Sequence, residues 1–157
     1  MREKATGWKL PLLFCAIILL FVGIFRPKKE DVSVPEELQR RAEAIVIDLE
    51  RDGRTWKEKI IAASGGFRSS EIKDLELERV IGEALENGRF DAACTAVVLV
   101  HDQEKKDVLL EGLYRKALQT CDTLPWAVFA LKAMKDEQKR SECARQLWET
   151  WQGGCGK

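Results

Sequence analysis

The chain has little of the material from which catalytic and metal sites are usually built. It contains one histidine among 157 residues, and its five cysteines form no Cys-X-X-Cys pair. Metal sites of the common types need several histidine, cysteine or carboxylate ligands that converge. His101 is followed by Asp102, but without a second histidine this pair is best explained as a solvated turn. No nucleophile–base pair or glycine-rich phosphate loop is visible, so we expect no enzyme activity and no cofactor.

An excess of charge of either sign is also absent. Lysine and arginine together number 26, as do aspartate and glutamate, so the net charge is zero. Nucleic-acid-binding proteins need a basic patch to contact phosphates, and we therefore do not expect a nucleic-acid partner. Nothing in the sequence indicates a small-molecule substrate. Charged runs such as residues 104–107 mix both signs, which is typical of solvated helix faces.

Stretches that alternate between polar and apolar residues, as β-strands do, are missing. Only four prolines occur, and none lies inside an amphipathic segment. From Ser33 onward, apolar residues recur at helical spacing and glycines interrupt the pattern. The sequence therefore predicts an all-α domain. We expect helices over about 33–52, 55–64, 71–87, 90–100, 104–120, 124–135 and 137–151.

One segment differs from the rest because it is apolar on all sides. Residues 10–25 carry no charge, and Lys9 and Arg26 flank them. As a helix they would span about 24 Å, near the lower limit for a bilayer core. A signal-peptide cleavage site needs small residues just after the apolar run, whereas this run ends in Ile24 and Phe25 and is followed by Arg26 and Pro27. The segment therefore predicts an uncleaved transmembrane helix rather than a secretory signal.

These features divide the chain into five expected segments. They are a basic tail (1–9), a transmembrane anchor (10–25), a linker (26–32), a helical-repeat domain (33–151) and a flexible tail containing glycine and cysteine (152–157). The protein is then expected to be a single-pass membrane protein. Basic residues are nearly balanced on the two sides of the anchor, so they do not fix its orientation. A short basic tail before a first span usually stays inside, which favours a C-terminal domain outside the cytoplasm.

A period of about 34 residues relates the later helices to one another. The aligned pairs include Ala93/Ala127, Ala96/Ala130, Asp102/Asp136 and Leu113/Leu147, and a shift of 33 residues aligns 73–75 with 106–108. Alanine allows helices to approach closely, and the two aspartates are placed to accept the free amides at helix starts. Units of this length are typical of stacked helix–turn–helix pairs.

In its period and helix pairing, the region from Ser33 to Trp151 resembles the tetratricopeptide-like α-solenoids. The consensus Trp…Leu-Gly…Tyr pattern of that family is not met, so its groove residues cannot be transferred to positions of this chain. The resemblance implies antiparallel helix pairs stacked as a short solenoid. It also implies a scaffold or adaptor that binds another protein. With the anchor added, the expected function is a membrane-anchored scaffold that holds a protein partner at the membrane.

Four aromatic residues are candidates for the surface that contacts this partner. Trp56 and Phe90 are separated by 34 residues and begin helices, while Trp148 and Trp151 lie at positions i and i+3 of the last helix. Exposed tryptophans often anchor protein interfaces. Trp151 occupies the repeat position of Ala117, so it can equally seal the end of the stack. Both roles remain open from the sequence.

Two cysteines support an alternative function. If the last two helices form a hairpin that turns near Asp136, residue 121 lies level with about residue 152. Cys155, on a glycine-containing tail, can then reach Cys121 and form a disulfide, which requires an oxidising compartment. Cys94 and Cys143 lie among apolar residues and are expected to be buried. The alternative function is a thiol-based or metal-handling accessory protein of a membrane complex.

Overall fold

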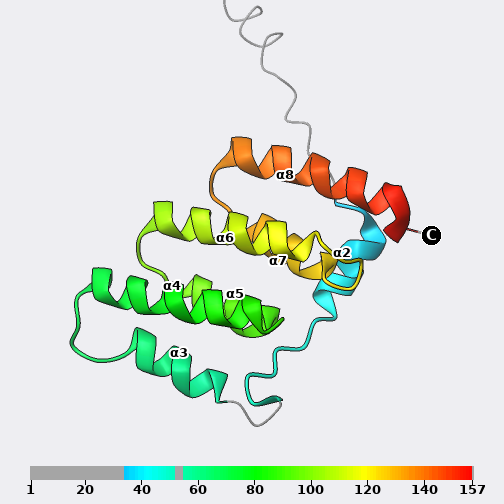
Figure 1. Ribbon diagram of the computed structural model, residues 1–157. Helices are drawn as coiled ribbons and strands as arrows, with labels where there is room; N and C mark the ends of the chain where they lie inside the picture. Colours follow the sequence, from blue (N-terminus) through cyan, green and yellow to red (C-terminus); the bar gives the residue numbers. More distant parts are fainter. Residues whose placement is uncertain (1–33, 52–54, 157) are drawn as a thin grey trace, which may run out of the picture. The chain divides into compact units, whose positions relative to one another are not determined.

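The computed structural model describes residues 34–51 and 55–156, which all belong to one compact unit of the chain. Within this part the fold contains seven α-helices, a short π-helical turn and no strand (Figure 1). The elements are α2 (Glu36–Glu43), α3 (Trp56–Ser64), α4 (Ser70–Glu86), α5 (Phe90–Val98), α6 (Gln103–Ala117), α7 (Leu124–Ala133), α8 (Glu137–Thr150) and η2 (Trp151–Cys155). The prediction of an all-α domain is confirmed.

Most helices pack against the helices next to them in the sequence, from α3 through to α8. Contacts also join alternate helices, so that α3, α5 and α7 form one layer, while α4 and α6 adjoin in the other. Figure 1 shows α4, α6 and α8 following one another on the same side. This arrangement is compatible with a helical solenoid.

The 34-residue period appears directly in the helix boundaries. Helices α5 and α7 begin 34 residues apart, at Phe90 and Leu124, as do α6 and α8, at Gln103 and Glu137. As expected, the Asp102 side chain accepts the Lys105 amide at the start of α6, and Asp136 accepts two amides at the start of α8. These side chains satisfy amides that a helix cannot bond internally, so they fix where each helix begins.

A second aspartate in each unit joins it to the next unit. Asp74 of α4 is buried and accepts the backbone amides of His101 and Asp102, at 2.8 and 2.9 Å. One period later, Asp107 of α6 accepts the Lys135 amide at 3.3 Å. Each carboxylate thus holds the turn before the helix that follows in its own layer. Burial raises the pKa of Asp74, but the hydrogen bonds from His101 and Asp102 outweigh it and the pKa lies below its usual value.

The core lies between the two layers and is rich in alanine where helices cross. Helices α5 and α7 contribute alanines that are fully buried, and their small side chains let the neighbouring helices approach. The fully buried alanines of these two helices are Ala92, Ala93, Ala96, Ala127 and Ala130. Leu113 and Leu147, which align in the repeat, are also fully buried. The alanine positions of the repeat therefore have a packing role.

The first helix ends much earlier than the sequence predicts. A helix was expected to continue to about residue 52, but α2 ends at Glu43 and residues 44–51 leave the helical conformation. Helix α2 packs against α7, which is distant in the sequence, and the chain then returns toward α3 (Figure 1). The β-branched residues Ile45, Val46 and Ile47 weaken the helix here. The backbone of residues 48–51 instead bonds to the start of α5.

The predicted membrane location needs correction. In residues 34–51 and 55–156, no helix is long and apolar enough to cross a bilayer. The expected anchor, residues 10–25, lies outside the described residues, together with the tail 1–9 and the whole linker 26–32. A single-pass membrane protein with its C-terminal domain outside the cytoplasm is therefore a wrong prediction for the part that the structure describes. The described helices each bury one side against neighbouring helices and expose the other.

Candidate functional site

The four aromatic residues proposed as a contact surface occupy different environments. Trp56 and Phe90 are buried, so neither ring is exposed at the surface of the domain, and their contact with a partner stays a prediction. Trp56 belongs to the core side of α3, and Phe90 stacks on Trp126 with ring centroids 6.3 Å apart. Both begin helices, and both belong to the hydrophobic core. Trp148 is 38% exposed, which keeps it available at the surface of α8.

Trp151 lies where α8 meets the C-terminal tail and is half-buried against the core. Its carbonyl accepts the Gly156 amide at 2.9 Å. The indole lies so close to Gly156 that a Cβ at this glycine would come within 2.7 Å of Nε1. Trp151 therefore packs on both the core and the tail, an environment that suits the sealing role considered for it.

A disulfide holds the same end of the fold. Cys121, in the loop between α6 and α7, is bonded to Cys155 of η2, with their Cα atoms 5.3 Å apart. Arg41 of α2 donates a hydrogen bond to the Cys121 carbonyl at 3.4 Å. The first helix, an internal loop and the tail thus meet at this point. Cys121 is exposed, whereas Cys155 is half-buried.

The two remaining described cysteines are free thiols that are poorly suited to reaction. Cys94 is buried, and burial together with the Asp91 charge raises its pKa far above the usual range. Burial, followed by the charges of neighbouring glutamates, also raises the pKa of Cys143. Because the thiolate is the reactive form, both groups are held in their unreactive form at neutral pH. Among the described residues, no group of three or more histidine, cysteine or carboxylate side chains is placed to bind a metal ion.

A buried ion pair at the start of α5 was not expected from the sequence. Gly88 adopts a φ of 69° after α4, and the Arg89 amide then bonds back to the Ala84 carbonyl at 2.8 Å. This turn directs the Arg89 side chain inward, where its Nε and Nη2 donate to Asp91 at 3.0 and 2.9 Å. No sequence signal marks the pair, because arginine and aspartate two residues apart are ordinary at a helix start.

The same arginine holds the segment that leads from α2 to α3. Arg89 Nη1 donates to the Arg51 carbonyl at 3.0 Å, and Nη2 donates to the Asp48 carbonyl at 2.5 Å. Asp91 in turn accepts the Asp48 amide at 3.4 Å. Burial raises the pKa of Asp91, but the hydrogen bonds from Arg89 outweigh it and the pKa is lowered. The Arg89–Asp91 pair therefore fixes residues 48–51 to the start of α5 through these hydrogen bonds.

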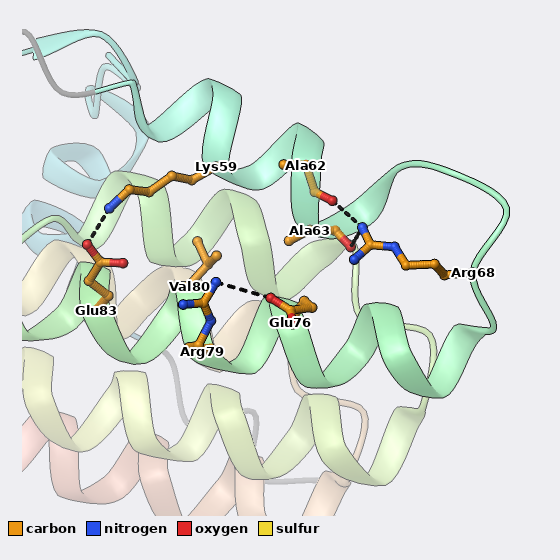
Figure 2. A pocket seen from close by; sticks show the side chains of 8 residues that line it. All are labelled: Lys59, Ala62, Ala63, Arg68, Glu76, Arg79, Val80 and Glu83. Atoms are coloured by element: carbon orange, nitrogen blue, oxygen red, sulfur yellow. Dashed lines mark hydrogen bonds and ion pairs between the residues drawn. The ribbon is translucent and has the colours of Figure 1, made fainter.

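A groove of about 370 Å³ lies between α3 and α4 (Figure 2). Three small or branched apolar residues form part of its lining, Ala62 and Ala63 from α3 and Val80 from α4. The charged lining residues are three cations and two carboxylates: Lys59, Arg68, Arg79, Glu76 and Glu83. We call this site the α3–α4 groove. No motif marks it, because its two walls come from separate helices.

The ion pairs of the α3–α4 groove are distributed unevenly along it. Lys59 pairs with Glu83, and Arg79 pairs with Glu76 at 3.2 Å. Arg68 forms no ion pair with a carboxylate of the described residues. Its Nη2 donates to the carbonyls at the end of α3, including that of Ala62 and, at 3.3 Å, that of Ala63 (Figure 2). Arg68 thereby satisfies carbonyls that the helix leaves free at its C-terminus.

Large apolar side chains are exposed on the outer side of α4 and α6. Leu75 of α4 and Val108 of α6 are 61% and 62% exposed. They occupy the same position of the repeat, 33 residues apart, on two helices that contact each other. Ile72, one turn before Leu75, is also exposed. We call Ile72, Leu75 and Val108 the apolar stripe.

Comparisons of this chain with protein-family models, curated proteins and solved structures found no match. The number and packing of its helices are compatible with a helical solenoid. The function has to be argued from the surfaces described above.

Proposed function

We propose that this domain is a short, tetratricopeptide-like helical solenoid that serves as a scaffold for a protein partner. Helix starts that recur every 34 residues support the proposal. So do the aspartates, Asp74 and Asp107, that connect each unit to the next. A stack of this kind offers extended surfaces built from equivalent positions of successive units, and such surfaces suit protein binding.

The observation that carries the proposal is the apolar stripe. Single exposed apolar residues are common on protein surfaces and need no explanation. Here the same repeat position exposes a large apolar side chain on two adjoining helices, Leu75 on α4 and Val108 on α6. Large apolar side chains that are exposed on adjoining helices favour a site that binds another protein. On α8 the equivalent position is Glu142, so the stripe ends there.

Site-specific crosslinking tests the scaffold function. A photoreactive amino acid is placed at position 75, 108 or 132 of the full-length chain in its native cells. Lys132 is the control because it is exposed but lies on α7, in the other layer. We expect the same partner to be crosslinked from 75 and 108 and not from 132. In addition, Leu75→Glu with Val108→Glu should abolish binding of that partner in purified form. Equal adducts from all three positions, or none from the stripe, would refute the proposal.

A second proposal is a thiol-based role, which the Cys121–Cys155 disulfide favours. In its reduced form the pair would give two electrons and two protons to a disulfide of a partner protein, and would itself become oxidised. Cys121 is the more exposed residue of the two and would attack first. A Cys155→Ser variant should then accumulate a mixed disulfide between Cys121 and the partner. Failure to trap any adduct, when Cys121 is demonstrably reduced, would exclude this role.

A further inference from the structure

The α3–α4 groove lies where one more helix of the repeat would pack. Helix α4 contacts both the helix that follows it in the other layer, α5, and the next helix of its own layer, α6. A helix placed one unit earlier in the stack would in the same way contact both α3 and α4. The helix that comes before α3 in the sequence does not take this place, because α2 packs against α7.

The side of α4 that lines the groove differs in chemistry from the equivalent side of α6. At the positions of Leu109 and Gly112 on α6, α4 has Glu76 and Arg79. On α6, Leu109 is half-buried against the core, and Gly112 carries no side chain. The charged residues of α4 instead lie beside a floor of Ala62, Ala63 and Val80. An occupant of this groove therefore needs apolar side chains for the floor and charged groups for the rim.

The charged residues that line the groove determine whether its ligand should be acidic or basic. At one end, Lys59 and Glu83 neutralise each other. At the other, two arginines face one carboxylate, Glu76, so this end has an excess of positive charge. Arg68 bonds to the end of α3 through Nη2. Its Nε and Nη1 take no part in these bonds, and each carries an N–H group that can donate to a carboxylate.

We propose that the α3–α4 groove binds an acidic amphipathic helix of a protein partner, whose carboxylate pairs with Arg68 and Arg79. This inference rests on the proposal that the domain binds proteins, and it names the chemistry of the ligand. The apolar side of the bound helix covers Ala62, Ala63 and Val80. Phe67, which is exposed and precedes Arg68 in the chain, extends that apolar contact.

The test uses a displayed library of 16-residue helical peptides that is selected on the full-length chain. We expect the selected peptides to carry glutamate or aspartate beside apolar residues spaced three and four positions apart. Arg68→Ala and Arg79→Gln should each weaken their binding about tenfold or more, the loss typical of a hydrogen-bonded charge. Lys132→Gln, which removes one positive charge far along the chain on α7, is the matched control and should leave binding unchanged.

Charge reversal separates recognition from a structural effect, because Arg68 also caps α3. Arg68→Glu should lose the acidic peptides and select peptides that carry lysine or arginine instead, which a merely disturbed α3 would not do. The proposal is overturned if no peptide is selected, if acidic residues are not enriched, or if binding does not depend on Arg68 and Arg79. It is also overturned if the groove variants abolish self-association, because the occupant is then a second copy of the chain.

Failure of this inference can be distinguished from failure of the scaffold function. Crosslinking from positions 75 and 108 depends on the apolar stripe and not on the groove. If a partner is crosslinked from the apolar stripe but no acidic peptides are selected, the scaffold function is supported. Only the proposal that the α3–α4 groove binds an acidic helix is then refuted.

Discussion

Replacing Arg89 by alanine should destabilise the fold more than most single substitutions. The substitution removes hydrogen bonds to Asp91 and to the carbonyls of Asp48 and Arg51, and it leaves the Asp91 carboxylate buried without its cation. Side chains of the pair are only 10% and 9% exposed, so solvent screens them little. Removal of one member of a buried ion pair typically costs about 3–5 kcal/mol. We expect a loss in this range for the free energy of unfolding.

The assay is urea unfolding of the full-length chain, followed by far-ultraviolet circular dichroism at pH 7. An Arg89→Met, Asp91→Leu double variant should recover much of the loss, because no charge is then left buried. It should not recover the anchoring of residues 48–51, since the arginine bonds to that backbone are still missing. Hydrogen exchange of the Asp48 amide should therefore be faster in both variants than in the wild type.

The pH dependence gives an independent check on the same pair. Because the pKa of Asp91 is lowered in the folded state, its contribution is fully present above the unfolded value of about 3.9. It is lost as the pH falls through the folded pKa. The acid side of the stability curve should therefore be shallower in the double variant. The reasoning is refuted if Arg89→Ala costs less than about 1 kcal/mol, or if the double variant is no more stable than the single one.

Three further predictions concern other parts of the fold. Cys155→Ser should lower the free energy of unfolding by about 3–4 kcal/mol under oxidising conditions, because the disulfide closes a long loop, and wild type and variant should become equal once reduced. Asp136→Ala should cost about 1 kcal/mol in urea unfolding, since the side chain caps α8, and Asp136→Asn should retain most of that stability. Asp74→Asn should make the free energy of unfolding depend less on pH below about pH 4. The lowered pKa of Asp74 means that its carboxylate stabilises the fold fully above that pH, and that this stabilisation is lost as the pH falls through the folded pKa. An unchanged acid profile would contradict the role given to the hydrogen bonds that Asp74 accepts.

The elements that could be predicted from the sequence are those that local chemistry determines. Helix starts at Gln103 and Glu137 follow from the aspartates that precede them, and a side-chain cap acts within three residues. Contacts between distant segments were not predictable in this way. The early end of α2 depends on bonds between residues 48–51 and Arg89, about forty positions away in the chain. Periodicity marks a residue as apolar, but it does not show whether another element covers it.

The burial of Trp56 and the exposure of Leu75 illustrate this limit. Both are apolar residues on predicted helices, and the sequence favoured Trp56 as the surface residue. In the fold, Trp56 is fully buried, while Leu75 is 61% exposed. The α3–α4 groove was missed for the same reason, since its charged and apolar residues come together only when α3 and α4 pack.

The docking of α2 on α7 has a consequence for the order in which the domain folds. Arg41 and Cys121 are 80 positions apart, so this contact closes a far larger chain loop than the contacts between consecutive helices. The entropy lost on closing such a loop delays its formation, whereas neighbouring helices meet through short turns. We expect α3 to α7 to assemble first and α2 to dock late. The same helix should then be among the first to detach, in brief openings of the native state that leave the central pairs intact.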